Sequence, residues 1–321
     1  MRPAVRTLGG RLIRRRLLVV VFVAAAGLTA CLPVAVNRPL PPTKAATTPP
    51  NVPQAFDACS APSVDAMAAW WNYSPYTSVG IYVGGVGRFC PQPNLTSAWV
   101  GAVVNQGWHL APIWVGPQAP CVTFDNKIPT GVGARAAGIA EADAAVGAMR
   151  ALGLSAWLTP IYYDLESYKT RPSDGSCAVP DGERQAIMTT TVQVFVAAWT
   201  EELNRYGFLS GLYSSLCSGI LDESTVPRVP QFGAYPPDAV WIGAWSGNPN
   251  LFGFPAVATT PPAPSCPALP DSVWWNHARI HQYLGGHTET WPAPSVPNTP
   301  SSTSVTLNVD TSIVNGPLAP P

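Results

Sequence analysis

From residue 54 onward, short runs rich in β-forming residues alternate with longer amphipathic runs. The β-rich runs predict strands at 55–58, 79–83, 109–115, 159–165, 209–213, 240–244, 279–283 and 306–309. The amphipathic runs predict helices at 64–71, 95–106, 135–152 and 183–206. Gly107, Gly153 and Gly207 each follow one of these runs, where a glycine typically ends a helix. Because strand–helix–strand order brings successive strands together in parallel, the chain predicts an α/β fold with a parallel sheet.

The number of strands indicates how this sheet is arranged. Eight strands within residues 54–321 match the size of a single-domain (β/α)8 TIM-type barrel. An open, doubly wound sheet is the alternative, and such a sheet usually has a glycine-rich phosphate-binding loop after its first strand. Here Cys59-Ser60-Ala61-Pro62 follows instead, so a dinucleotide-binding domain is excluded.

The first 30 residues have the pattern of an export signal. Arg14, Arg15 and Arg16 precede an apolar run at 17–28, which is shorter than the ~20 apolar residues of a membrane-spanning helix. Leu28-Thr29-Ala30-Cys31 resembles a bacterial lipobox, in which Cys31 would be lipidated. Ordinary cleavage after Ala30 and an uncleaved anchor are the alternatives. We expect export by the Sec or twin-arginine route, to the outer face of the cytoplasmic membrane or into the cell envelope.

Proline-rich stretches predict a tether before the folded domain and two loops within it. Residues 31–53 are rich in proline and have no periodic apolar pattern, which predicts an extended tether before the domain at 54–321. Two further proline-rich stretches, 247–272 and 291–303, predict long surface loops inside that domain.

The chain has seven cysteines, and setting aside Cys31 leaves an even number. In an exported protein six cysteines predict three disulfides, although the 15 possible pairings stay open. The six are Cys59, Cys90, Cys121, Cys177, Cys217 and Cys266. A zinc site is the alternative, but no Cys-x-x-Cys or His-x-x-x-His spacing is present, and no metal or cofactor is expected.

Charge excludes a class of partner. The chain has 18 basic and 18 acidic residues, but six of the arginines lie in residues 1–30. The remainder, with 12 basic and 18 acidic residues, has a net charge of −6. A chain with this balance has no electrostatic reason to bind nucleic acid.

Polar and aromatic residues gather at the ends of the predicted strands, where a barrel of this type has its active site. They are Asp57, Tyr82, Asp164, Glu166, Tyr213, Trp245, Gln282 and Asp310. Tyr82, Tyr213 and Trp245 could stack on the apolar faces of sugar rings, although packing in the core is the alternative for each. Trp70, Trp71, Trp99 and Trp199 lie in the helical runs and are expected in the core.

The fourth predicted strand carries the most specific pattern. Side chains alternate across a strand, so Tyr162, Asp164 and Glu166 share a face that points into the barrel mouth. Glycoside hydrolysis needs such a carboxyl pair, one protonated and one ionised, and close like charges separate the pKa values of the two groups. A solvated acidic loop is the alternative reading of this pattern.

The order of these motifs is similar to that of the actinobacterial glycoside hydrolase-like family, a domain of unknown function with exported mycobacterial cell-wall members. The motifs are Phe-Asp-x-Cys-x-Ala-Pro, Gly-Ile-Tyr-Val-Gly-Gly, Ile-Tyr-Tyr-Asp-Leu-Glu, Gly-Leu-Tyr-Ser-Ser, Trp-Ile-Gly-Ala-Trp, His-Gln-Tyr and Val-Asp, within residues 54–315. More distantly, the chain resembles the Chalaropsis-type lysozymes of glycoside hydrolase family 25, which are (β/α)-barrels that cleave peptidoglycan.

The lysozyme resemblance implies a role for each candidate residue. Glu166 would be the general acid, and Asp164 would assist the developing positive charge or orient an N-acetyl group. Asp57 and Asp310 would complete the acidic floor. Tyr82, Tyr213, Trp245 and Gln282, with Tyr162 on the same strand face as the acids, would position the sugar. The disulfide framework and the proline-rich insertions are not lysozyme features.

The sequence leaves three alternative functions open. The first is a muramidase-like O-glycosyl hydrolase acting on peptidoglycan or another cell-wall polysaccharide, with the membrane contacted only through the lipid anchor and the protein a monomer. The second is a non-catalytic cell-wall glycan-binding barrel. The third is a metal-dependent hydrolase using Asp57, Asp164, Glu166 and Asp310.

Overall fold

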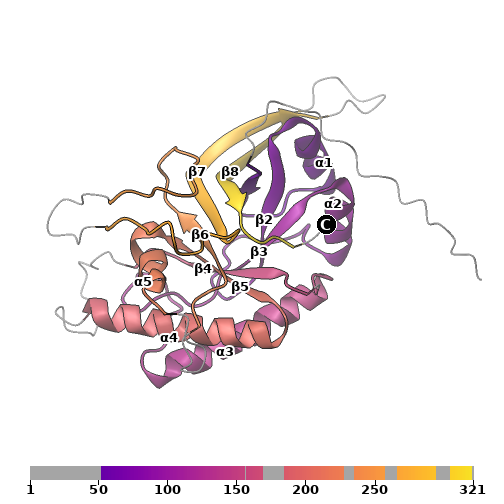
Figure 1. Ribbon diagram of the computed structural model, residues 1–321. Helices are drawn as coiled ribbons and strands as arrows, with labels where there is room; N and C mark the ends of the chain where they lie inside the picture. Colours follow the sequence, from indigo (N-terminus) through magenta and orange to yellow (C-terminus); the bar gives the residue numbers. More distant parts are fainter. Residues whose placement is uncertain are drawn as a thin grey trace, which may run out of the picture. The chain divides into compact units, whose positions relative to one another are not determined.

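Eight strands of the described chain close into one barrel (Figure 1). The computed structural model describes residues 52–155, 157–168, 184–227, 235–256, 266–293 and 304–319. In barrel order the strands are β1 (Gln54–Asp57), β2 (Tyr76–Gly84), β3 (His109–Trp114), β4 (Pro160–Leu165), β5 (Leu209–Ser215), β6 (Ala239–Gly243), β7 (Arg279–Pro292) and β8 (Ser304–Asn315). The closed barrel confirms the predicted α/β, TIM-type fold class.

The direction of the last strand differs from the expectation. Strands β1 to β7 pair in parallel with their neighbours along the chain, whereas β8 is antiparallel to both β7 and β1. The pairing of β7 with β8 runs from Arg279 opposite Asn315 to Pro292 opposite Ser304, as in a hairpin. A hairpin reverses the chain without a crossover helix, so β8 returns in the opposite direction. Part of the predicted loop at 291–303 therefore belongs to these strands, and 294–303 lie outside the described residues.

Helices cover the outside of the barrel. They are α1 (Val64–Tyr73), α2 (Ser97–Gln106), α3 (Val132–Ala151) and α4 (Arg184–Arg205), and after β5 come a π-helical turn η1 (Leu216–Ile220) and the short α5 (Leu221–Ser224). The Ser63 hydroxyl accepts a hydrogen bond from the Ala66 N–H at the start of α1, and Thr96 does the same for α2. Gly107 ends α2 with a φ of 109°, as its position predicts. Figure 1 shows α3 and α4 lying side by side.

Apolar side chains fill two layers, one inside the barrel and one between the strands and helices. The interior layer includes Ile113, Tyr162 and Trp241. The outer layer includes the four tryptophans predicted for the core, which are all buried: Trp70, Trp71, Trp99 and Trp199. On β4, Tyr163 packs against Phe195 and Trp199 of α4, so the two faces of this strand point as predicted.

Disulfides join the loops of the barrel. Cys59 after β1 is bonded to Cys90 after β2, and Cys217 of η1 is bonded to Cys266. Cys121 is also disulfide-bonded, and Cys177 lies outside the described residues. Disulfides are typical of proteins that fold outside the cytoplasm, so the chain is of the exported type. Among the described helices, none combines the length and apolarity needed to cross a membrane. The predicted signal at 1–30 and almost all of the tether at 31–53 lie outside the described residues.

Candidate functional site

Four carboxyl groups lie at the end of the barrel where the parallel strands finish, and we call them the carboxyl cluster. Asp57 is the last residue of β1, Asp164 is next to last in β4, and Glu166 follows that strand. Asp310 lies directly opposite Asp57 on the antiparallel pair of β1 and β8. The sequence placed Asp310 at the end of the eighth strand. It instead lies within β8, and it reaches the mouth because β8 extends past the end of β1.

Gln282 of β7 connects the cluster to the aromatic residues of the mouth. Its side-chain nitrogen donates to Asp57 Oδ2 at 3.2 Å and to Asp310 Oδ2 at 3.3 Å. Its side-chain oxygen accepts from the Tyr213 hydroxyl and from Trp245 Nε1, each at 2.9 Å. The amide is buried and its donors and acceptors are engaged. The sequence predicted that Gln282 would contact sugar, whereas these bonds make it the residue that positions the groups around it.

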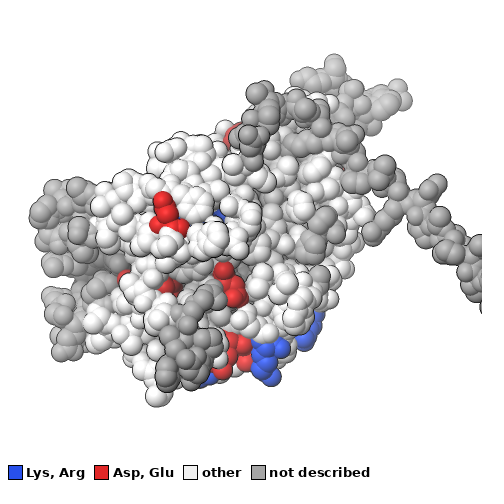
Figure 2. Space-filling model, viewed as in Figure 1, with Lys and Arg blue, Asp and Glu red and all other residues white. Residues whose placement is uncertain are grey.

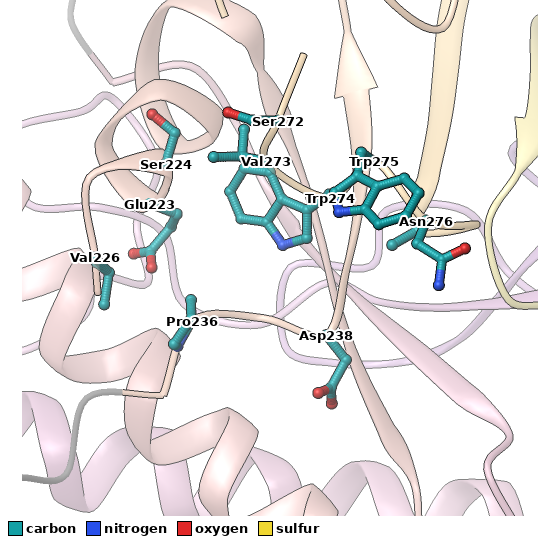
Figure 3. Close-up of a pocket in the computed structure, with 11 residues that line it drawn as sticks. Glu223, Ser224, Val226, Pro236, Asp238, Ser272, Val273, Trp274, Trp275 and Asn276 are labelled. Atoms are coloured by element: carbon teal, nitrogen blue, oxygen red, sulfur yellow. The ribbon is translucent and has the colours of Figure 1, made fainter. Parts of the chain in front are cut away.

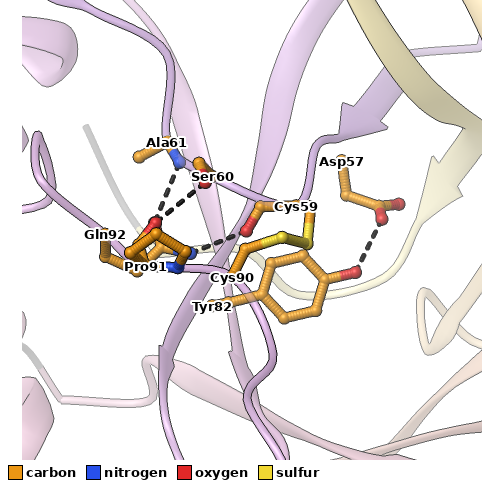
Figure 4. Close-up of a disulfide and its surroundings, with 8 residues drawn as sticks. All are labelled: Asp57, Cys59, Ser60, Ala61, Tyr82, Cys90, Pro91 and Gln92. Carbon is orange, nitrogen blue, oxygen red and sulfur yellow. Dashed lines mark hydrogen bonds between the residues drawn. A yellow bond between two sulfur atoms is a disulfide. The ribbon is translucent and has the colours of Figure 1, made fainter.

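Tyr82 links the cluster to a disulfide at the rim. Its hydroxyl donates to Asp57 Oδ1 at 2.9 Å, and its ring lies beside the Cys59–Cys90 disulfide (Figure 4). The Gln92 side chain ties the same loops together, because it donates to the Cys59 carbonyl and accepts from the Ala61 N–H. The disulfide thus holds the loops after β1 and β2 at the edge of the acidic mouth.

Burial raises the pKa of each carboxyl group in the cluster, and repulsion between the groups adds to the rise for Asp57, Asp164 and Glu166. The pKa of Asp57 rises to about 7, chiefly because the side chain is buried and then because Asp310 is close, while hydrogen bonds from Tyr82 and Gln282 oppose the rise. The pKa of Asp164 rises well above its usual value, first through burial and then through Glu166, Asp57 and Asp310. Burial, followed by repulsion from Asp310, raises the pKa of Glu166. Burial also raises the pKa of Asp310. Asp57 is therefore about half protonated near pH 7, and the protonated form of the other three groups is favoured relative to free carboxyl groups.

Asp164 differs from the other acids in its bonding. Its Oδ1 atom is buried and has no hydrogen-bond partner among the described residues. The backbone on either side is held by Gln118, which donates to the Asp164 carbonyl at 2.8 Å and accepts from the Glu166 N–H at 2.8 Å. Sequence reasoning did not identify Gln118, because a glutamine in a loop has no distinctive spacing. This clamp fixes the backbone from which both acidic side chains project.

A pair of glycines in β7 shapes the aromatic side of the mouth. The Gly286 N–H donates to Asp310 Oδ1, and Gly286 has a φ of 59°, where a side chain would be strained. A Cβ on Gly285 would lie 2.2 Å from Cε2 of Trp245, so the indole lies directly against this glycine. Trp245 is 66% exposed and keeps a free ring face at the mouth.

A cavity of about 210 Å³ opens beside Asp164 and Glu166. The disulfide, Tyr82 and Gln118 line it, and residues that the sequence did not single out complete it: Arg88, Phe89 and Phe124. Phe89 is 94% exposed, so an apolar ring stands at the rim next to the acids. This cavity, which we call the first cavity, is a place where a ligand could contact the carboxyl cluster.

Tyr162 is not part of this mouth. The side chain is fully buried inside the barrel, and its hydroxyl donates to the Pro317 carbonyl at 2.9 Å, in the segment after β8. It shares a strand face with Asp164, as predicted, but it lies one layer deeper and supports the floor. Its expected role in positioning sugar is therefore replaced by a packing role.

The charged side chains around the site and the residues available as metal ligands indicate which chemistry the site can support. Figure 2 shows few basic side chains on the face it presents, most of them along its lower edge. Within the described part of the chain, no three His, Cys, Asp or Glu side chains are grouped so as to hold a metal ion. Among the same residues, none of the four carboxyl groups forms an ion pair. The arrangement is suited to proton transfer and to stabilising a positive charge beside a polar, aromatic-walled mouth.

Comparisons with known proteins identify relatives of this chain. A family model described as "Rv2525c-like, glycoside hydrolase-like domain" matches residues 68–313. This match confirms the resemblance predicted from the sequence. No curated protein matches the chain.

Similar solved structures include two bacterial or phage proteins. One is an uncharacterized B. stearothermophilus protein, with 17% identity over 82% of this chain and 95% of that chain and a TM-score of 0.44. Another is the catalytic domain of endolysin ply40 from bacteriophage P40 of Listeria monocytogenes, with 13% identity, coverage of 83% and 95%, and a TM-score of 0.41.

Proposed function

Because this chain belongs to the Rv2525c-like, glycoside hydrolase-like domain family, we propose that it hydrolyses glycosidic bonds in peptidoglycan or another cell-envelope polysaccharide. The observation that carries the proposal is the pairing of Asp164 with Glu166. One is a buried acid with an oxygen that lacks a partner among the described residues. The other lies two residues later at the edge of the first cavity, where solvent reaches the residue although the surrounding protein desolvates its carboxyl group. A protonated acid beside a second carboxyl group is the arrangement that glycoside hydrolysis requires.

In the proposed reaction, Glu166 donates its proton to the glycosidic oxygen as the bond from that oxygen to the sugar C1 breaks. The positive charge that develops on the sugar ring is stabilised by the carboxylate that Glu166 becomes as it loses its proton, and by the members of the cluster that are ionised. Water adds to C1, and its released proton returns to the cluster. Burial and Asp310 raise the pKa of Glu166, and this favours the protonated form that a general acid needs.

The aromatic residues supply a place for the sugar. The exposed face of Trp245 could stack on a pyranose ring, and its Nε1 bond to Gln282 at 2.9 Å holds the indole in place. The hydroxyl groups of Tyr82 and Tyr213 bind Asp57 and Gln282, so these side chains act mainly by ordering the acids. Binding and proton transfer would then use adjoining parts of one mouth.

The location of the protein is part of the proposal. We propose that the exported chain is a monomer, lipidated at Cys31, and that its proline-rich tether holds the barrel near the wall polymer. Its contact with the membrane would be through the lipid anchor alone, and nucleic acid is not a partner.

The test compares the wild type with Glu166→Gln on purified peptidoglycan and on other cell-envelope glycans. New reducing ends and pull-down on the insoluble glycan are scored separately. We expect reducing ends from the wild type alone, with equal pull-down of both proteins. The matched control is Glu201→Gln, which removes an exposed acid of α4 and should leave both readouts unchanged.

Two outcomes would favour other functions. No reducing ends from either protein, with equal pull-down, would indicate a glycan-binding barrel, for which the exposed Trp245 is already suited. Loss of activity with a chelator would indicate the metal-dependent hydrolase.

A further inference from the structure

Exposed apolar side chains lie on two loops at the rim of the first cavity. In the loop after β2, Phe89 is 94% exposed and Val86 is 59% exposed. In the loop after β3, Phe124 is 44% exposed. Phe89 and Phe124 line the first cavity together with Glu166. We call Val86, Phe89 and Phe124 the apolar rim.

Covalent and backbone bonds hold both loops. The Cys59–Cys90 disulfide closes the first loop directly after Phe89. Backbone hydrogen bonds of 2.8 Å join Gln118 to residues 126 and 128, so Phe124 lies within a closed loop. The apolar rim is therefore presented on fixed loops, as is typical of a surface that binds another molecule or a membrane.

One arginine carries the net charge of these loops. Arg88 lines the first cavity, and it forms no ion pair with any described residue. Its guanidinium donates to the Tyr82 carbonyl at 3.3 Å. Lys127 and Asp125 of the second loop have opposite charges. The two loops thus combine apolar side chains with one net positive charge, which favours an anionic group beside them.

The larger cavity, at the opposite end of the barrel, is built differently. Its volume is about 410 Å³, and it lies where β6 and β7 begin, because Asp238 and Ala278, which line it, immediately precede these strands. Trp275 is its exposed ring, but Trp274 stands between that ring and the buried acid Glu223 (Figure 3). Of these two cavities, the first is the one in which exposed rings adjoin the carboxyl cluster.

The first cavity lies on the side of the acids where the leaving group would be. Glu166, the proposed general acid, lines it, whereas Trp245 and its partner Gln282 are not among the described residues that do. A general acid protonates the oxygen between the sugar and the leaving group. With the sugar against Trp245 and that oxygen at Glu166, the leaving group extends into the first cavity, past the apolar rim.

From this placement we propose that the leaving group is an anionic lipid, so that the substrate is a glycan linked to lipid in a membrane. The inference rests on the proposed function, because Glu166 defines the side on which the leaving group lies. In the reaction Glu166 gives its proton to the glycosidic oxygen, and the bond from that oxygen to C1 breaks. The lipid leaves as its alcohol, and water supplies the new hydroxyl group at C1 and returns a proton to Glu166.

A lipid fits the apolar rim better than a wall polymer does. A polysaccharide would place hydroxyl and amide groups against Phe89 and Phe124, whereas acyl chains would remove the two rings from water. Aromatic side chains beside a basic residue are typical of segments that enter the headgroup layer of a membrane, and Arg88 would lie beside the anionic group. Because the rim adjoins the cavity, the molecule that covers it is the one whose sugar enters the mouth.

The tether is long enough for the mouth to face the membrane. β1 begins at the end of the barrel away from the carboxyl cluster, so the chain enters from that side. At about 3.3 Å each, residues 31–53 span at most roughly 75 Å, whereas a domain of this size is roughly 45 Å across. The apolar rim can therefore reach a membrane that holds Cys31.

The first test measures binding to vesicles with residues 32–321, which contain the whole described barrel and lack the proposed lipidation site. Flotation is compared on phosphatidylcholine vesicles with and without about 30% phosphatidylglycerol, an anionic lipid. We expect capture on the anionic vesicles, about tenfold weaker for Phe89→Ser and about fivefold weaker for Arg88→Gln. Val194→Ser, which changes an exposed apolar residue of α4, is the control and should bind like wild type.

The second test asks whether the lipid lies next to the mouth. The octyl and methyl glycosides of the β-1,4-linked N-acetylglucosamine dimer are titrated by NMR into ¹⁵N-labelled Glu166→Gln, in which turnover does not interfere. The octyl glycoside is kept below its critical micelle concentration. We expect it to bind at least about tenfold more tightly than the methyl glycoside, because part of its chain is buried. Adding Phe89→Ser and Phe124→Ser should reduce this preference to about twofold, and thermal unfolding checks that this variant is folded.

Failure of this inference and failure of the proposed function give different results. Reducing ends from a wall polymer, with no vesicle capture or with no octyl preference, would overturn the lipid and keep the hydrolase. Vesicle capture and an octyl preference, without hydrolysis of any glycan, would keep the lipid-linked ligand and overturn cleavage. Equal vesicle capture by wild type and folded Phe89→Ser would overturn the inference by assigning the lipid to another surface. Self-association that Phe89→Ser abolishes, without vesicle capture, would overturn it by assigning the apolar rim to a second copy of the chain.

Discussion

The indole of Trp245 occupies the space in which a side chain at Gly285 would stand, with only 2.2 Å between Trp245 Cε2 and an added Cβ. Gly285→Ala should therefore displace the indole and break its bond to Gln282. We expect the affinity for glycan to fall roughly fivefold, which corresponds to about 1 kcal/mol of binding free energy, because one anchored aromatic contact is lost. Affinity electrophoresis on soluble glycan measures the effect. Gly147→Ala in α3, where nothing lies within 4 Å of the added carbon, is the control and should bind like wild type. Unchanged binding by Gly285→Ala would show that Trp245 does not contact the glycan.

The raised pKa of Asp57 makes stability depend on pH. The folded value is about 7, whereas an unfolded chain has a value of about 4. Between these values the unfolded state releases a proton that the folded state keeps, so the unfolding free energy falls as pH rises through this window and levels off above pH 7. The expected loss is on the order of a few kcal/mol.

Thermal unfolding at pH 5 and pH 8 checks this dependence. We expect a higher Tm at pH 5 for the wild type and a smaller difference for Asp57→Asn, which cannot ionise. A wild-type Tm that increases from pH 5 to pH 8, or an equal slope in both proteins, would contradict the buried, protonated state of Asp57.

Gln282 should be sensitive to substitution because four groups depend on its amide. Gln282→Leu would leave Asp57, Asp310, Tyr213 and Trp245 without that partner, and we expect a loss of about 2–4 kcal/mol in unfolding free energy. Tyr213→Phe removes one of these bonds and should cost about 1 kcal/mol. Chemical denaturation measures both. Equal costs for the two variants would mean that the amide does not act as the connecting group.

Arg279 is a structural cation whose loss should be severe. It is fully buried, and its guanidinium donates to the carbonyls of Val273, Leu251 and Pro270 and lies over the Phe252 ring. Arg279→Leu should cost about 3–5 kcal/mol, because these loop carbonyls lose their donors. Arg135→Leu breaks an exposed pair with Glu201 and should cost at most about 1 kcal/mol. The two variants are compared by urea denaturation, and a cost for Arg279→Leu as small as that of the control would rule out this role.

Local patterns predicted most of the barrel. The runs at 109–115 and 159–165 match β3 and β4 to within one residue, because period-two alternation and helix-ending glycines are local signals. The direction of β8 was not predictable in this way. It depends on the hairpin pairing of β7 with β8 between Arg279 and Asn315, where proline and threonine give no clear periodicity.

Local patterns at the strand ends also predicted part of the candidate site. Strand ends pointed to Asp57, Asp164, Glu166 and Asp310, and the structure brings these side chains to one mouth. The depth of Tyr162 and the clamp by Gln118 depend on how distant segments meet. The Tyr162 hydroxyl donates to the Pro317 carbonyl, and the Gln118 side chain donates to the Asp164 carbonyl. Such long-range contacts leave no spacing in the sequence.

The reversed direction of β8 brings both ends of the barrel chain to the same side. Gln54 at the start of β1 pairs with Ile313 near the end of β8, and the Ala319 N–H donates to the carbonyl of Leu110 near the start of β3. A bead or sensor chip coupled to the chain beyond Ala319 would therefore lie at the end of the barrel where the parallel strands begin, and it would leave the carboxyl cluster turned toward the solution. Immobilised protein should then bind a bulky insoluble polymer through the mouth that holds the carboxyl cluster as well as free protein does.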